Sequence, residues 1–134
     1  MEKKNKKSEQ EAIAEQDEDV LIVQEATHLI DGVHSGTIKN VVRENRQGFD
    51  YVDIYIDVED EKGNPMTIKT GFPAYISVNS GFGRFLDEAG MMYKAGDKLS
   101  LSEIKTEIIG KEISFQTHTE DNFAKVINKT IRFG

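Results

Sequence analysis

Two tyrosines and three cationic residues carry the clearest chemistry in this sequence. Tyr51 and Tyr55 lie four positions apart in a segment that alternates strictly between apolar and polar residues, so both rings face one side of a strand. Lys69 is expected on the same face of the returning strand, and Lys39 and Arg43 on that face of the preceding strand, opposite to Ile38 and Val42. Bases stack on exposed rings while cations follow the phosphates of a single strand. We therefore predict a platform for single-stranded nucleic acid on this face.

Two smaller groups of residues extend this prediction. Lys125 and Lys129 would lie on one side of the last predicted strand. Arg46 and Phe49 lie in a loop after the first long strand, where Gly48 allows the backbone to move and the loop to close over a ligand. For the two lysines, the alternative interpretation is a solvated edge strand that uses its charges to prevent pairing with other chains.

The tyrosines also have a purely structural interpretation. Tyrosine suits exposed strands and packs well against neighbours across the sheet. Asp53 and Asp57 are expected on the same face as the two rings, where their carboxylates would repel phosphate. The sequence leaves both interpretations of this face open.

No residues have the spacing of a catalytic or metal site. The chain has no cysteine, and its three histidines (His28, His34 and His118) are far apart without the spacing of a zinc motif. The glycines at 81 and 83 lack the lysine and the following serine or threonine of a phosphate-binding loop. We expect no enzyme activity, no cofactor and no bound metal.

The composition is that of a small acidic protein. The 134 residues have a mass of 15.1 kDa, which allows one domain, and the net charge is −7. Residues 1–30 hold 4 Lys and 8 Asp or Glu, a net of −4, so residues 31–134 carry only −3 and have room for a local basic groove. No apolar run approaches the ~20 residues of a membrane helix, and no signal peptide is recognisable. A cytoplasmic protein without a membrane partner is expected.

The hydrophobic pattern divides the chain at residue 20. Residues 1–19 are almost all charged or polar, which predicts a disordered charged tail, whereas residues 20–134 are expected to form the domain. A short strand is predicted over 20–23, and five longer strands over 33–42, 51–58, 66–72, 112–118 and 123–133. A helix is predicted over 80–89, with Asn79 or Ser80 as its N-cap and Gly90 as its end, and a helical turn over 101–109 with Ser102 as its N-cap.

This order of elements predicts an all-β fold with a short helix, in the form of an OB-fold-like five-stranded antiparallel Greek-key barrel. A helix after the third strand is the arrangement found in that fold. Gly36 would supply the bend or bulge that lets the first long strand serve both sides of the barrel. An irregular β-sandwich is the competitor, but it needs more strands and no helix in the middle of the chain.

Several short segments support the same fold when taken in order: 31–38 (DGVHSGTI), 51–58 (YVDIYIDV), 71–73 (GFP), 79–86 (NSGFGRFL) and 109–115 (IGKEISF). Together they resemble small OB-fold proteins of phages, mobile elements and their hosts that are single-stranded-DNA-binding-like. The resemblance covers residues 30–133. It implies an OB-fold and a role in DNA replication or recombination, and no binding residue is carried over from it.

Two functions therefore stand. The first is non-catalytic binding of single-stranded nucleic acid, DNA in particular, by aromatic stacking and a basic groove. The second is a protein-interaction or assembly module, homo-oligomers included, in which the acidic tail docks on a partner or restricts access to the groove. An apolar patch at Met91, Met92 and Tyr93 would favour the second function.

Overall fold

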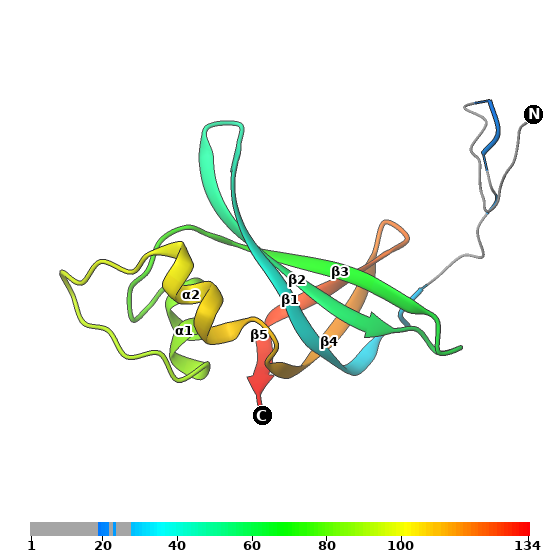
Figure 1. Ribbon diagram of the computed structural model, residues 1–134. Helices are drawn as coiled ribbons and strands as arrows, with labels where there is room; N and C mark the ends of the chain where they lie inside the picture. The colour runs from blue at the N-terminus through cyan, green and yellow to red at the C-terminus, as the bar shows by residue number, and fades with distance from the viewer. Residues whose placement is uncertain (1–18, 22, 24–27) are drawn as a thin grey trace, which may run out of the picture.

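The computed structural model describes residues 19–21, 23 and 28–134, which contain five strands and two short helices (Figure 1). The tail predicted over residues 1–19 therefore lies outside the described residues, except for Asp19. None of the described helices is both long and apolar enough to cross a bilayer. The elements are β1 (Gly32–Arg46), β2 (Phe49–Glu59), β3 (Pro65–Pro73), α1 (Gly81–Glu88), α2 (Leu101–Ile108), β4 (Glu112–Glu120) and β5 (Phe123–Phe133).

β1 is the central strand of one antiparallel sheet with the strand order β3-β2-β1-β4-β5. Its first part pairs with β4 and its second part with β2, and Thr37 pairs with both Asp57 and Glu112 where the partner changes. Gly36 lies beside this crossing, and a Cβ there would be 2.6 Å from Cγ2 of Ile56. Glycine is needed at this position because β2 approaches the β1 backbone too closely for a side chain.

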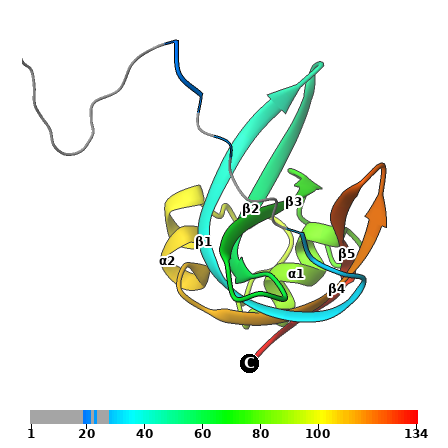
Figure 2. The ribbon, with the colours of Figure 1, turned by 90° about the vertical axis from the view of Figure 1, so that its right-hand side faces the viewer.

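The two edges of the sheet, β3 and β5, face one another because the sheet curls around its core (Figure 2). Side chains link them: Nδ2 of Asn128 donates to the carbonyl oxygen of Gly71 at 3.0 Å, and the Thr70 hydroxyl donates to Oδ1 of the same Asn128. No backbone ladder joins β3 to β5 among the described residues. The all-β class with a short helix is confirmed, whereas the sheet is not closed into the predicted barrel.

The core lies inside the curl of the sheet, and the helix α1 contributes two aromatic rings to it. Ring centroids are 5.7 Å apart for Phe72 and Phe82, 5.2 Å for Phe72 and Phe85, and 5.2 Å for Phe85 and Phe133. The alternation of β2 is confirmed on this inner face by four buried aliphatic residues: Val52, Ile54, Ile56 and Val58.

Serine caps begin both helices. The Ser80 hydroxyl accepts from the backbone N–H of Gly83 at 2.9 Å, as one of the two predicted caps of α1 would. For α2 the predicted cap, Ser102, is wrong: Ser100 is the N-cap and forms a reciprocal pair of hydrogen bonds with Glu103. Both serines lie next to Leu101, and the glutamate three residues after Ser100 completes a capping box that Ser102 lacks.

A short segment before β1 contributes Leu29 to the hydrophobic core, where it is fully buried. Its neighbours bind both hairpins. The Ile30 N–H donates to Oε2 of Glu61 in the β2–β3 turn at 2.8 Å, and the Thr117 hydroxyl of β4 donates to the Ile30 carbonyl at 3.0 Å. Oδ1 of Asp31 accepts from the N–H and the hydroxyl of Thr119, both at 2.7 Å. We call this segment the Leu29 plug, and no periodic pattern in the sequence predicts it.

The strand predicted over residues 20–23 is absent at the residues that the structure describes there. Val20, Leu21 and Val23 lie outside any strand, and their side chains are exposed. A run of β-branched residues favours a strand only where a partner strand is available, and the pairings of β1 involve only β2 and β4.

Candidate nucleic-acid interface

A β-bulge in β1 decides which predicted cations share a face with the tyrosines. Lys39 has no partner in the β1–β2 register, and the alternation of side chains reverses beyond it. Val41 is therefore buried instead of the expected Val42. Arg43 pairs with the core-facing Val52, so it lies on the face opposite to the two tyrosines. The expectation that Arg43 shares their face is wrong.

Asp53 is the centre of the candidate site. The alternation of β2 places it on the outer face as expected, yet its side chain is only 2% exposed. Arg46 forms an ion pair and a hydrogen bond with its Oδ2, and the Lys69 Nζ lies 3.8 Å from the same oxygen. A carboxylate this well buried needs such partners, because an unpaired buried charge is very unfavourable. The sequence predicts that this carboxylate faces solvent and repels phosphate. In the structure the Asp53 carboxylate is instead buried, and the two cations neutralise its charge.

The two predicted tyrosines lie on either side of this carboxylate, and each ring carries one of the same cations. The Arg46 Cζ is 5.1 Å from the centroid of the Tyr51 ring, and the Lys69 Nζ is 5.9 Å from the centroid of the Tyr55 ring. Both distances are within the range of cation–π attraction. We call these five residues the Asp53 cluster. Two cations and one carboxylate give it a net charge of +1.

Gly71 makes room for the Asp53 cluster. It pairs with Asp53 across β2 and β3, and a Cβ at this position would lie 2.6 Å from the Asp53 Oδ1. The carboxylate therefore occupies the space that a side chain of β3 would otherwise fill. The sequence contains a usable signal for this burial: a strand glycine directly opposite an aspartate, which the hairpin register makes recognisable.

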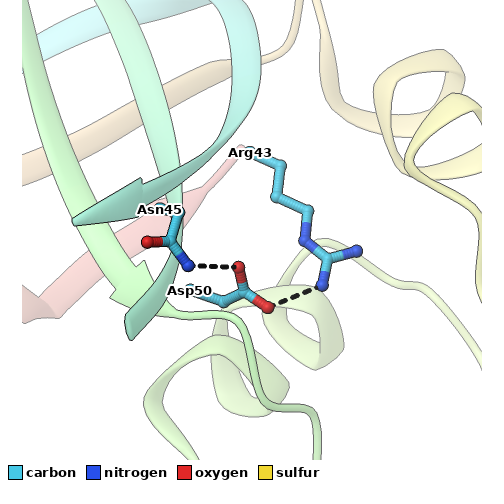
Figure 3. Close-up of polar contacts among 3 residues, drawn as sticks. All are labelled: Arg43, Asn45 and Asp50. Carbon is cyan, nitrogen blue, oxygen red and sulfur yellow. Dashed lines mark hydrogen bonds and ion pairs between the residues drawn. The ribbon is translucent and has the colours of Figure 1, made fainter. Parts of the chain in front are cut away.

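The hairpin between β1 and β2 extends beyond the rest of the sheet as an arm (Figure 1). Near its end, Arg43 donates to Oδ2 of Asp50 at 2.8 Å, and Nδ2 of Asn45 lies 3.5 Å from Oδ1 (Figure 3). The hydrogen bond from Arg43 holds the pKa of Asp50 below its usual value, with smaller contributions from Asn45 and from the charge of Arg43. Phe49 lies at the tip, well exposed, beside the turn that contains Gly48.

The predicted cations thus differ in their local charge balance. Lys39 lies 3.9 Å from Oδ1 of Asp57, on the outer face beyond the Asp53 cluster. Lys125 pairs with His118 on the outer face of β4 and β5. Lys129 and Arg132 line a hollow of about 550 Å³ between α1 and β5. Among the described residues, no carboxylate oxygen lies within 4 Å of the amino group of Lys125 or Lys129.

The expected apolar patch near the helices is only partly formed by the residues proposed for it. Met92 is 93% exposed, but Met91 and Tyr93 pack against the core, and the Tyr93 hydroxyl donates to the Gly83 carbonyl at 2.9 Å. Val78, from the loop after β3, is also exposed, at 79%. The exposed side chains of Val78 and Met92 therefore form an apolar rim, in place of the predicted patch of Met91, Met92 and Tyr93.

Comparison with known proteins does not assign the chain to a family. No protein-family model matches the chain, and no curated protein is significantly similar to it in sequence. Within the described part of the chain, no group of three or more histidine, aspartate or glutamate side chains is placed to hold a metal ion. The Asp53 cluster and its surroundings are therefore the basis for proposing a function.

Proposed function

We propose that this protein binds single-stranded nucleic acid, DNA in particular, without catalysis, through an OB-fold-like Greek-key barrel. The observation that carries the proposal is the Asp53 cluster, in which two half-buried tyrosines of β2 share the outer face of the sheet with Arg46 at the end of β1 and Lys69 of β3. Rings for stacking and cations for phosphates are the two components of a sequence-tolerant site for a single strand.

The fold supports this proposal through its strand order. The sheet runs β3-β2-β1-β4-β5 and curls so that β3 and β5 face one another, and α1 follows β3. This is the order of an OB-fold, a barrel that is often only partly closed. The links from Asn128 to Thr70 and Gly71 lie where such a barrel would close.

Binding would exchange partners within the Asp53 cluster. Arg46 and Lys69 occupy positions over the two rings, and an arriving base would take over the ring while the cation turns to the adjacent phosphate. The side chains of Arg46 and Lys69 are 38% and 51% exposed, so both already reach solvent and can turn towards a phosphate without first being uncovered. Asp53 would keep both cations close to the rings before a strand arrives.

The other candidates would act around this centre. Lys39 lies at the border of the same face, and Lys125 and Lys129 lie on β5 beyond the seam with β3. Arg43 and Phe49 belong to the arm, from which they could contact a strand only as the arm folds over it.

A protein-interaction or assembly module is the second candidate function. The exposed apolar side chains of Val78 and Met92 favour it, because soluble monomers seldom leave such residues together beside a groove. It uses a different surface from the Asp53 cluster, so each function can be tested separately.

Fluorescence-anisotropy titration with labelled oligo-dT at two salt concentrations tests the first function. Tyr55→Leu should weaken binding by ~1–3 kcal/mol with an unchanged salt dependence, because stacking releases no counterions. Lys69→Gln should lower the slope of log affinity against log salt by ~0.7. Tyr75→Leu and Lys105→Gln are matched controls on the loop after β3 and on α2, and they should leave both quantities unchanged.

Two results would contradict the proposal. One is an intact protein that shows no binding of oligo-dT at tens of micromolar and low salt. The other is an equal loss of affinity for Tyr55→Leu and for its control Tyr75→Leu, since the effect would then not belong to the Asp53 cluster. Either result leaves the interaction module as the better account.

A further inference from the structure

An apolar groove opens beside the rim at the helical end of the molecule. It has a volume of about 270 Å³ and is formed by the loop after β3 and the loop before α2. Ile76, Tyr93 and Leu99 contribute its apolar lining. Val78 belongs to the same wall, and the fully exposed Met92 follows the packed Met91 next to it. The groove is therefore an unfilled apolar surface of the size of two or three aliphatic side chains.

The same chain exposes an apolar segment that could fill such a groove. Val20, Leu21 and Val23 are 60%, 90% and 95% exposed. Aliphatic side chains in succession are costly to leave in water, at about 25 cal/mol for each Å² of apolar surface. A segment of this kind before the first strand and an open apolar groove on the domain are complementary in chemistry.

Val23, and with it the apolar segment as a whole, cannot enter the groove of its own molecule. The Leu29 plug is tied to Glu61 in the turn before β3, whereas the groove is formed by residues that follow β3. The eight steps from Pro65 to Pro73 span about 26 Å at ~3.3 Å each. Only six steps separate Val23 from Leu29, which is at most about 21 Å. Figure 1 shows the chain entering β1 at the end of the molecule opposite to the loop before α2.

Charge also favours this pairing of surfaces. Residues 9–19, which directly precede the apolar segment, contain six Asp or Glu and no Lys or Arg. Lys94 and Asp97 line the groove and Lys98 follows them in the same loop, so these three residues carry a net charge of +1. Among the described residues, no carboxylate oxygen lies within 4 Å of either amino group. An acidic stretch that arrives with the apolar segment would meet these two lysines.

We propose that residues 20–23 of one copy occupy the groove beside Val78 and Met92 of a second copy, so that the chain associates head to tail. The contact joins two different surfaces, and each added copy exposes a new groove and a new segment. Short linear assemblies of variable length follow, instead of a symmetric dimer. This proposal does not depend on nucleic-acid binding, because the groove and the Asp53 cluster share no residue.

Sedimentation equilibrium of the full chain over a range of concentrations tests the proposal, with variants on each surface. The average mass of the unaltered protein should rise steadily with concentration and pass beyond that of a dimer. Leu21→Glu places a charge in the apolar segment and Met92→Glu places one at the rim beside the groove, and each should weaken association by about tenfold or more. Val33→Glu, at an exposed site on β1, is the matched control and should associate normally.

Mixing the two variants gives the sharpest result. Leu21→Glu keeps an intact groove and Met92→Glu keeps an intact segment, so an equimolar mixture should form a one-to-one dimer and nothing larger. The double variant Lys94→Gln, Lys98→Gln should weaken association at low salt and have little effect at high salt. These variants change only exposed side chains, so circular dichroism should show unchanged folding.

Three outcomes would overturn the proposal. The first is an unaltered protein that stays monomeric at millimolar concentration. The second is a mixture of the two variants that stays monomeric, which would exclude a contact between these two surfaces. The third is an association that stops at a dimer, because two copies would then exchange their segments reciprocally instead of associating head to tail.

Discussion

Replacing Asp53 by asparagine should make the protein less stable and a better ligand for single strands. Asp53 neutralises one of the two cations that lie over the tyrosines, so Asp53→Asn raises the charge of the Asp53 cluster from +1 to +2. Asparagine keeps the shape of the side chain and one acceptor oxygen. The substitution therefore removes charge with little change in packing.

The cost in stability follows from the exposure of the partners. Breaking a fully buried ion pair costs ~3–5 kcal/mol, because the remaining charge stays buried. Here the side chains of Arg46 and Lys69 are 38% and 51% exposed, so both can be hydrated after the change. We expect a loss of about 1–2 kcal/mol in the free energy of unfolding, measured by urea denaturation.

The gain in binding follows from the freed cation. One additional phosphate contact should make the slope of log affinity against log salt steeper by ~0.7. For a fourfold increase in salt, this slope gives about 2.6-fold more loss of affinity than the unaltered protein shows. Anisotropy titration with oligo-dT should therefore show tighter binding at low salt and a smaller advantage at high salt.

Asp121→Asn in the β4–β5 turn is the control, since it changes the net charge of the protein by the same amount away from the Asp53 cluster. Asparagine tolerates the positive φ of 53° at that position. The reasoning is refuted when Asp53→Asn binds more weakly than the unaltered protein, or when Asp121→Asn steepens the salt dependence equally. Weaker binding would mean that the carboxylate is needed to position the cations more than it restrains them.

Three further predictions concern the Leu29 plug and the acidic residues. Leu29→Ala should lower the free energy of unfolding by ~2–5 kcal/mol, whereas removal of residues 1–19 should leave the melting temperature nearly unchanged; thermal denaturation of both checks this. Hydrogen bonds from Thr119 hold the pKa of Asp31 below its usual value, so this stabilisation is complete above the ~3.9 of a free aspartate and is lost as pH falls through the lower, folded-state pKa. The melting temperature of Asp31→Asn should consequently fall less than that of the unaltered protein between pH 5 and pH 3, by calorimetry. Deleting residues 9–19 should tighten binding of oligo-dT at low salt by removing competing carboxylates, and no change in affinity would exclude a role of these residues in controlling the site.

The strongest sequence patterns predicted the elements of this fold. The alternation over 51–58 gave the correct strand and inner face, and Ser80 with Gly90 bounded α1 correctly, because each signal depends only on neighbouring residues. The position of Arg43 could not be found in this way. One unpaired residue, Lys39, reverses every later side chain of β1, and its place depends on the register with β2.

Two other features depend on contacts between distant segments. Asp53 reads as a solvated residue of an alternating strand, and its burial requires a cation from the arm, a lysine from β3 and the missing side chain of Gly71. Leu29 belongs to no periodic pattern, and the residue after it binds partners that lie 31 and 87 positions further along the chain. Local propensity carries no information about either arrangement.

The Leu29 plug also sets an order for the folding of the chain during synthesis. Ile30 binds Glu61, which follows 31 residues later, and Thr117, which follows 87 residues later. At ~5–20 residues per second, roughly 4 to 18 s pass between the synthesis of the plug and that of its last partner. In that interval the β1–β2 and β2–β3 hairpins can form from neighbouring segments. The side chain of Leu29 meanwhile stays exposed to water or bound to a chaperone. The first apolar residue of the core is thus among the last to be buried, and a ribosome-bound chain that ends before β4 should be cleaved by protease next to Leu29 far more readily than the finished protein.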